Sequence, residues 1–275
     1  MKDKKFFGYD FSQLTVIGIL TVLFLFICVF CIGNKDNNAP RENMHSENQD
    51  NNIRDHGDIP HVNKSVFLSK GQSAPIVDSN NNTIKSMVVG VGWSPVRATE
   101  YRNDIDSTVI LVDSQTKETC EICYYRLKGP NGSVFHHGYN LTGDDAENTF
   151  GESVYKDDEN IDVYLDKVPL GYDKIYFVLN IFDANARGQT LNLVQDMYIN
   201  IYNSGDNNLL MNYRVDGNTP GNALILGVAT RDVTYNKQLQ NADDVAKSCW
   251  TFKALGEPYF AEDIKQLCIT CSQLQ

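Results

Sequence analysis

Short hydrophobic runs dominate the chain from Val66 onward, and Gly, Asn, Asp or Pro residues separate one run from the next. Several runs are rich in Val, Ile, Tyr and Phe, which favour strands, and turn sequences such as Pro130–Gly132 lie between them. Many short strands with few helical patterns predict an all-β fold, a β-sandwich of two antiparallel sheets. The predicted strands are Met87–Trp93, Thr108–Val112, Glu121–Leu127, Ile161–Leu165, Ile175–Phe182, Met197–Asn203, Leu209–Tyr213, Leu224–Thr230 and Cys249–Leu255.

Helical spacing appears near the C-terminus, at Ala261–Cys271. Ile264, Leu267 and Cys268 fall on one side of such a helix, as the 3.6-residue period requires. We predict a short C-terminal helix that closes the sandwich.

A long hydrophobic segment near the N-terminus, Leu14–Ile32, contains 19 residues without a charge. As a helix it would be roughly 28 Å long, close to the bilayer core of about 30 Å. It lacks the polar stripe of a helix in a soluble core, so it predicts one transmembrane helix that precedes the sandwich. A cleaved signal peptide is the main alternative, although the run is long for one and no Ala-x-Ala-like cleavage site follows it.

The segments around this helix define the expected domain organisation. Residues 1–13 are a short basic segment, residues 14–32 the transmembrane helix, residues 33–64 a polar linker and residues 65–275 the β-sandwich domain. The linker is rich in Asn, Asp and Glu and poor in large hydrophobic residues, so we expect a disordered tether. Three lysines precede the helix and two basic residues follow it closely, which favours a cytoplasmic N-terminus in a single-pass membrane protein.

The charge balance restricts the classes of partner. The 275 residues include 35 acidic and 24 basic ones, and the formal net charge is −11. This balance argues against nucleic acid as a partner, since phosphate binding needs a basic face. The same excess of acid fits cation binding, and it fits solubility equally well.

Carboxylates are concentrated in the stretch Gly138–Pro169. It carries two acidic groups, Asp144, Asp145 and Glu147 followed by Asp157, Asp158 and Glu159. The six carboxylates of these two groups repel each other unless a cation lies among them or water screens them. Ca²⁺ is the usual ion where the ligands are carboxylate and carbonyl oxygens. A solvated acidic loop is the alternative on composition alone.

A series of short motifs resembles the TerD family of tellurium-resistance proteins. They occur in the family's order over the whole globular part, which makes the resemblance specific. The motifs are Leu68–Gln72, Val89–Trp93, Asn103–Asp106, Leu127–Val134, Asn140–Gly143, Asp157–Glu159 with Leu165–Pro169, and Asp183–Ala184 with Ala186–Gln189.

The resemblance implies a β-sandwich that binds calcium ions through an acidic surface and that has no established catalytic activity. It also implies a role in tellurite and general stress resistance. Taken from the family motifs, with Asp144 added from the segment after Gly143, the expected calcium ligands are Asp104, Asp106, Asn140, Thr142, Asp144, Asp157, Asp158, Glu159 and Asp183. Because Ca²⁺ takes six to eight oxygens, several loops must converge at one end of the sandwich.

The chain also departs from the family pattern. Tyr139 and Ser94 stand where the family commonly has Asp, and the link between Gly143 and Asp157 is longer than in the family. One of two calcium sites is therefore expected to be weakened or absent. Asp144 in the longer link is a candidate replacement ligand.

Two C-x-x-C pairs, Cys120 with Cys123 and Cys268 with Cys271, raise the question of a zinc site. The first pair lies on or beside a predicted strand, where residues three apart face opposite sides. That spacing disfavours a shared metal ion. A disulfide within or between the pairs remains open for an extracytoplasmic domain.

These observations together predict a membrane-anchored, calcium-binding module that acts through protein partners of a stress-response complex and is not an enzyme. No nucleophile–base signature or cofactor motif favours catalysis. The alternative function is a receptor domain for a small ligand resembling a cyclic nucleotide, because the same family includes cyclic-AMP-binding proteins of slime moulds.

Overall fold

The computed structural model describes residues 65–94, 104–138, 157–216, 218–232 and 249–274. The predicted transmembrane helix at 14–32 and the linker at 33–64 lie outside these residues. Within the described part, no helix is long and apolar enough to cross a membrane.

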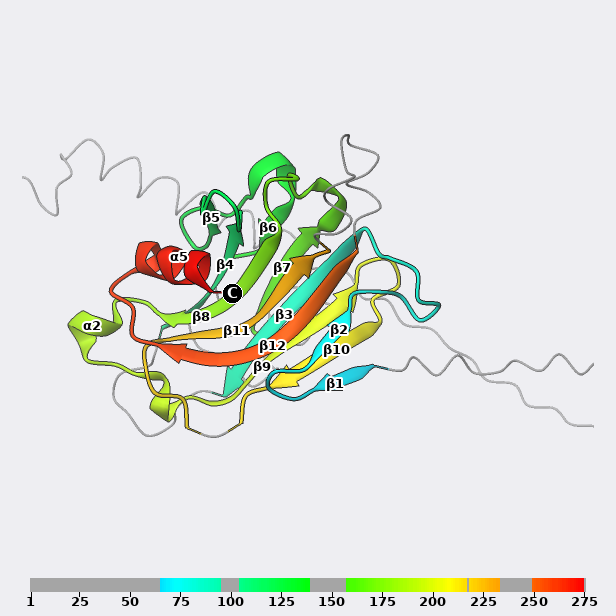
Figure 1. Ribbon diagram of the computed structural model, residues 1–275. Helices are drawn as coiled ribbons and strands as arrows, with labels where there is room; N and C mark the ends of the chain where they lie inside the picture. Colours follow the sequence, from blue (N-terminus) through cyan, green and yellow to red (C-terminus); the bar gives the residue numbers. More distant parts are fainter. Residues whose placement is uncertain (1–64, 95–103, 139–156, 217, 233–248, 275) are drawn as a thin grey trace, which may run out of the picture. The chain divides into compact units, whose positions relative to one another are not determined.

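Two six-stranded sheets form a β-sandwich, as predicted (Figure 1). We call them sheet 1 and sheet 2. In spatial order, sheet 1 consists of β1 (Val66–Leu68), β10 (Leu209–Arg214), β9 (Gln195–Asn203), β3 (Ser86–Ser94), β7 (Glu159–Tyr164) and β6 (Val134–His136). Sheet 2 consists of β2 (Ser73–Pro75), β12 (Trp250–Tyr259), β11 (Ala223–Arg231), β8 (Lys174–Ile181), β4 (Ile105–Val112) and β5 (Thr119–Ile122).

Short helical segments connect these strands. They are η1 (Pro130–Gly132), η2 (Leu165–Lys167), α2 (Ala184–Arg187) and η3 (Leu191–Leu193), and the chain ends with α5 (Ile264–Gln273). The Asp263 side chain caps α5 by accepting a hydrogen bond from the Gln266 backbone N–H at 2.8 Å. The predicted C-terminal helix is confirmed, and this cap explains why it begins three residues later than the hydrophobic spacing indicated.

The core lies between the two sheets and is built by residue alternation. In β7, Ile161 and Val163 face inward, and in β9 so do Ile199 and Ile201. β4 is buried at every position because its other face is also covered. There Ile110, with Tyr176 and Val178 of β8, packs against Leu267 and Cys271 of α5. The helix therefore closes one face of sheet 2, which we expected from its apolar side.

One pairing differs from the predicted antiparallel arrangement. β1 pairs with β10 in parallel, so sheet 1 is mixed. β1 and β2 lie at edges of opposite sheets, and a short turn joins them, in which the Gln72 N–H donates to the Ser69 carbonyl at 2.9 Å. The direction of β1 is therefore tied to the passage of the chain from one sheet to the other, which no local pattern reveals.

The strands of six or more residues were all predicted, although β4 begins three residues earlier than expected and β12 ends four residues later. β1, β2 and β6 have three residues each, too few to show alternation, and were not predicted. The predicted strand Glu121–Leu127 ends at Ile122, because Cys123 and Arg126 exchange backbone hydrogen bonds in a turn. Tyr124 and Tyr125, whose β propensity suggested a strand, lie in that turn.

Candidate functional site

The predicted acids that the structure describes lie at one end of the sandwich. β3 ends there at Ser94, next to the start of β7, and β8 ends at Ile181, next to the start of β4. The two sheets are connected at this end by a hydrogen bond from the Ser107 N–H to Glu159 Oε2, at 2.8 Å. We call this end the acidic rim, defined by Asp104, Asp106, Asp157, Asp158, Glu159 and Asp183.

Asp104, Asp106 and Asp183 belong to sheet 2 and its continuation. The Asp104 carbonyl accepts the Phe182 N–H at 2.7 Å, which brings Asp104 beside the residue that precedes Asp183. Asp183 occupies the N-cap position of α2 in a left-handed conformation, with φ of 52°, and its side chain makes no capping hydrogen bond. Arg187 Nη1 lies 4.0 Å from Asp104 Oδ2, a distant ion pair on a partly exposed surface.

Asp106 is a buried carboxyl group without a hydrogen bond among the described residues. It lies opposite Asn180 in the β4–β8 pair and is 5% exposed. Burial, and then the negative charge of Asp104, raise the pKa of Asp106 to about 7. The folded state therefore holds this proton more tightly than the unfolded chain does. The free energy of unfolding therefore falls as the pH rises from about 4 to about 7, because Asp106 must ionise in the folded state at a pH where the unfolded chain has already lost this proton.

Asp157 lies on the outer face of sheet 1, against the backbone of β3. Its Oδ1 accepts a hydrogen bond from Asn200 Nδ2 at 2.8 Å. Its Oδ2 is buried and has no hydrogen-bond partner among the described residues, and the residue as a whole is 4% exposed. Burial raises the pKa of Asp157, although hydrogen bonding from the side chains of Asn200, Tyr202 and Tyr198 opposes that rise. The carboxylate fits here because Gly90 carries no side chain where it approaches.

Asp158 holds the end of β3 in place. Its Oδ2 accepts the Trp93 N–H at 2.7 Å. The neighbouring Ser94 hydroxyl donates to Asp196 Oδ2 at 2.8 Å. Asp196 was not among the predicted ligands, yet it places a carboxylate beside the serine that stands where the family commonly has Asp. The sequence contains no local signal for this contact, since it depends on the pairing of β3 with β9.

Glu159 points into the interior, unlike its neighbours. Its side chain is buried beside His136, with Nε2 and Oε2 3.7 Å apart. The same Nε2 lies 2.8 Å from the Ser107 hydroxyl, while the Gly138 N–H donates to His136 Nδ1. In a hydrolase triad the serine and the acid face opposite nitrogens of the imidazole, so this cluster lacks that geometry. Burial lowers the pKa of His136, which favours the neutral ring.

The remaining predicted ligands, Asn140, Thr142 and Asp144, lie outside the described residues. Among the residues that are described, no group of three or more His, Cys, Asp or Glu side chains could hold a metal ion. The described acids therefore meet at most in pairs. A complete calcium site at the acidic rim would need oxygens from further residues.

Four of the described cysteines lie on β5, in the turn after it and on α5, and Cys249 directly precedes β12. The five described cysteines, Cys120, Cys123, Cys249, Cys268 and Cys271, are all free thiols. Burial on the inner face of α5 raises the pKa of Cys268 to about 11 and that of Cys271 to about 12. Protonated, buried thiols of this kind are poor nucleophiles and poor metal ligands. Within the described ranges the C-x-x-C pairs form neither a disulfide nor a metal-binding group.

Comparison with known proteins identifies similar chains. A TerD domain model matches residues 65–270. General stress protein 16U of Bacillus subtilis is 34% identical over 199 residues, which cover 71% of this chain and 91% of that protein. Tellurium resistance protein TerD of Serratia marcescens is 31% identical over 201 residues, again 71% and 91% of the two chains. The crystal structure of SAV2460, a protein of unknown function, shares the fold with a TM-score of 0.51 and 15% identity, covering 70% of this chain and 99% of that one.

Proposed function

The chain belongs to the TerD domain family, and on that premise we propose that it is a membrane-anchored, calcium-binding module of a stress or tellurite-resistance system. It is non-catalytic and works by binding protein partners, not nucleic acid. The names of two similar proteins, a general stress protein and a tellurium resistance protein, support the stress role.

Two features of the acidic rim support calcium as the ligand. Asp157 Oδ2 is a buried carboxylate oxygen without a hydrogen bond among the described residues, and such an atom is costly unless a partner satisfies it. Asp106 has a pKa of about 7, because burial and Asp104 disfavour its charge. A divalent cation bound at either group would relieve the penalty there, since it supplies positive charge to oxygen ligands that otherwise lack it. Asp157 faces outward from sheet 1 and Asp106 outward from sheet 2, so one ion could not serve both.

The residues present fit a calcium ion only as part of a larger ligand set. Asp157 and Asp158 would approach one ion from the start of β7, and Asp104, Asp106 and Asp183 would approach a separate ion from the adjoining ends of β4 and β8. Asn140 and Thr142, in line with the family motif, and Asp144, from the longer link that follows it, would supply further oxygens. Glu159 would act by holding Ser107 and the two sheets together, because its Oε2 already accepts the Ser107 N–H. When bound, calcium would supply the charge that fixes these loops for a protein partner.

A calcium titration of the full chain tests this proposal. We expect calcium at 1 mM to raise the melting temperature of chelator-treated protein. If the dissociation constant is near 10 µM, the free energy of unfolding should rise by about 2.7 kcal/mol. The double variant Asp104→Asn/Asp158→Asn should lose this response. The response should also be larger at pH 8 than at pH 5, because Asp106 must lose its proton to serve as a ligand.

A matched double variant, Asp206→Asn/Glu257→Gln, controls for the change in net charge. Asp206 accepts the Asn208 N–H in the β9–β10 turn, and Glu257 pairs with Lys70 on an exposed surface. Both lie outside the acidic rim, so the control should respond to calcium like the parent chain. A melting temperature that calcium leaves unmoved, together with no heat of binding in calorimetry, would contradict the proposal.

Membrane anchoring through residues 14–32 is tested separately. We expect the full chain to stay with the membrane pellet after extraction at alkaline pH, whereas deletion of residues 14–32 should release it to the supernatant. The same membranes, treated with protease from outside, report which side carries the sandwich domain. Release of the intact chain by alkaline extraction would show that the segment does not span the bilayer.

A further inference from the structure

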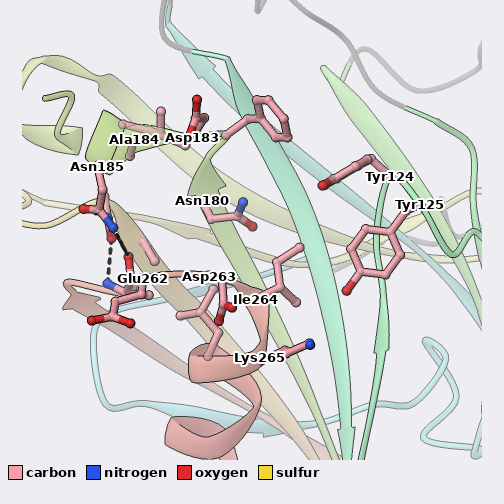
Figure 2. A pocket seen from close by; sticks show the side chains of 16 residues that line it. Tyr124, Tyr125, Asn180, Asp183, Ala184, Asn185, Glu262, Asp263, Ile264 and Lys265 are labelled. Carbon is pink, nitrogen blue, oxygen red and sulfur yellow. Dashed lines mark hydrogen bonds between the residues drawn. The ribbon is translucent and has the colours of Figure 1, made fainter. Parts of the chain in front are cut away.

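A cavity of about 380 Å³ lies between the N-terminus of α5, the end of β8 and the turn after β5 (Figure 2). Tyr124 and Tyr125 form one wall, and Asp263, Ile264 and Lys265 of α5 form another. In Figure 2 both tyrosines face Asn180 and the α5 residues across the cavity. The volume is that of a site for a small organic molecule.

The walls of this cavity are fixed by their own contacts. Tyr124 packs edge-on against Phe182 and against Tyr125, with ring centroids 5.4 and 5.0 Å apart. On the opposite side, Asn222 Nδ2 donates to the Ala261 carbonyl and Asn222 Oδ1 accepts the Ala261 N–H, both at 2.8 Å. These two hydrogen bonds hold the segment that leads into α5. The cavity is therefore preorganised, which lowers the entropic cost of binding.

One buried polar group in the cavity has an unused hydrogen-bond donor. Asn180 is 8% exposed, and its Oδ1 accepts the Thr108 hydroxyl at 2.9 Å. Its Nδ2 makes no hydrogen bond with any described residue, and the side chain lines the cavity. A ligand with an acceptor atom would satisfy this donor.

The charge of the lining indicates the sign of the ligand. Three carboxylates, those of Asp183, Glu262 and Asp263, line the cavity, against the single ammonium group of Lys265. The α5 dipole adds about half a positive charge at its N-terminus, which is less than the surplus of acid. The cavity is thus negative and lined with aromatic rings, a combination that favours a cation. An anionic ligand such as a cyclic nucleotide would be repelled, so this cavity does not suit the alternative function considered from the sequence.

We propose that this cavity binds a small organic cation: an ammonium group attached to a planar apolar body that carries a hydrogen-bond acceptor. The planar body packs against Tyr124 and Tyr125, the acceptor meets Asn180 Nδ2, and the ammonium group lies near Glu262 and Asp263. Asp183, a proposed calcium ligand, also lines the cavity. The inference does not require a bound calcium ion, and its test is done in chelator, so that either proposal can fail alone.

Tyramine is a suitable probe, and 3-(4-hydroxyphenyl)propionate is its matched anion of similar size. Calorimetric titration of the full chain in chelator should show binding of tyramine, weakened by added salt, and at least tenfold weaker binding of the anion. The double variant Glu262→Gln/Asp263→Asn should lower tyramine affinity about tenfold or more. Asparagine is as good an N-cap as aspartate, so this variant should keep α5 intact, which circular dichroism can verify.

Two further variants separate the aromatic wall from general effects. Tyr125→Ala should weaken tyramine binding about fivefold, and because Tyr125 is 53% exposed the change should leave folding intact. Asp206→Asn/Glu257→Gln, which removes the same charge elsewhere, should bind tyramine like the parent. Equal affinity for tyramine and the anion, or full affinity in either cavity variant, would overturn the proposal.

Discussion

Replacing Arg231 with alanine should lower the free energy of unfolding by about 3–5 kcal/mol, because it removes a large buried side chain together with its hydrogen bonds to backbone carbonyls. Arg231 is fully buried at the end of β11. Its Nη2 donates to the Val168 carbonyl at 2.8 Å, and its guanidinium group lies 4.6 Å from the Trp250 ring centre. Burial lowers the pKa of Arg231 to about 10, and Asp173 counteracts part of this shift, so the group stays charged at neutral pH.

Alanine at this position leaves a cavity beside Trp250 and a carbonyl without its donor, which is why the expected loss is large. Methionine fills much of the volume without a charge, so Arg231→Met should cost clearly less than Arg231→Ala. Arg214 provides the control, because its guanidinium also lies over a ring, 5.1 Å from that of Tyr198, but on an exposed side chain. Denaturant unfolding should show a loss below about 1 kcal/mol for Arg214→Ala. Equal losses for the two alanine variants would show that burial of Arg231 is not decisive.

Replacing Gly90 with alanine should both destabilise the fold, by about 2–3 kcal/mol, and weaken the calcium response. A methyl group at this position would overlap the Asp157 carboxylate. Because even Asp157 Cβ would lie only 2.8 Å from the new carbon, a side-chain rotation cannot relieve the clash. The hydrogen bond from Asn200 would be lost, and a proposed calcium ligand would be displaced.

A double-mutant cycle isolates this contact. Asp157→Gly removes the clashing carboxylate together with its Cβ, so Gly90→Ala should cost much less in that background than in the parent chain. Gly171→Ala is the control substitution, since its methyl group would meet only Asp113 Oδ2, at an ordinary 3.5 Å. Both unfolding in denaturant and the calcium titration should be measured for all variants. Strictly additive effects of the two changes would contradict direct overlap between residues 90 and 157.

The long strands were predictable because each of them carries its own hydrophobic pattern. β7 shows this clearly, since Ile161 and Val163 alternate with polar residues and are both buried. The same alternation contained a signal that family matching alone overlooked. Glu159 has the parity of these inward residues, and the structure accordingly places it in the interior beside Ser107 and His136.

The candidate site could be predicted as a set of residue types but not as a set of neighbours. The sequence identified Asp157 and Asp158 as part of the family motif. It did not show that Asp158 accepts a hydrogen bond from the Trp93 N–H, nor that Asp196 lies beside Ser94. Both contacts join segments of sheet 1 that are distant in the sequence. The organic-cation cavity was likewise hidden, since Tyr124 and Tyr125 resembled part of a strand and instead lie in a turn facing α5.

The sequence by itself determined the all-β class, the longer strands, the terminal helix and the TerD family, because a strand's period and a family motif are properties of neighbouring residues. Only the tertiary structure decided which carboxylate oxygen has no hydrogen-bond partner among the described residues and which carboxyl group has a raised pKa. It also decided which aromatic rings border a negative cavity. Those properties depend on burial by, and charge from, residues on other strands and on α5. Local sequence patterns do not show which of these distant residues will be in contact.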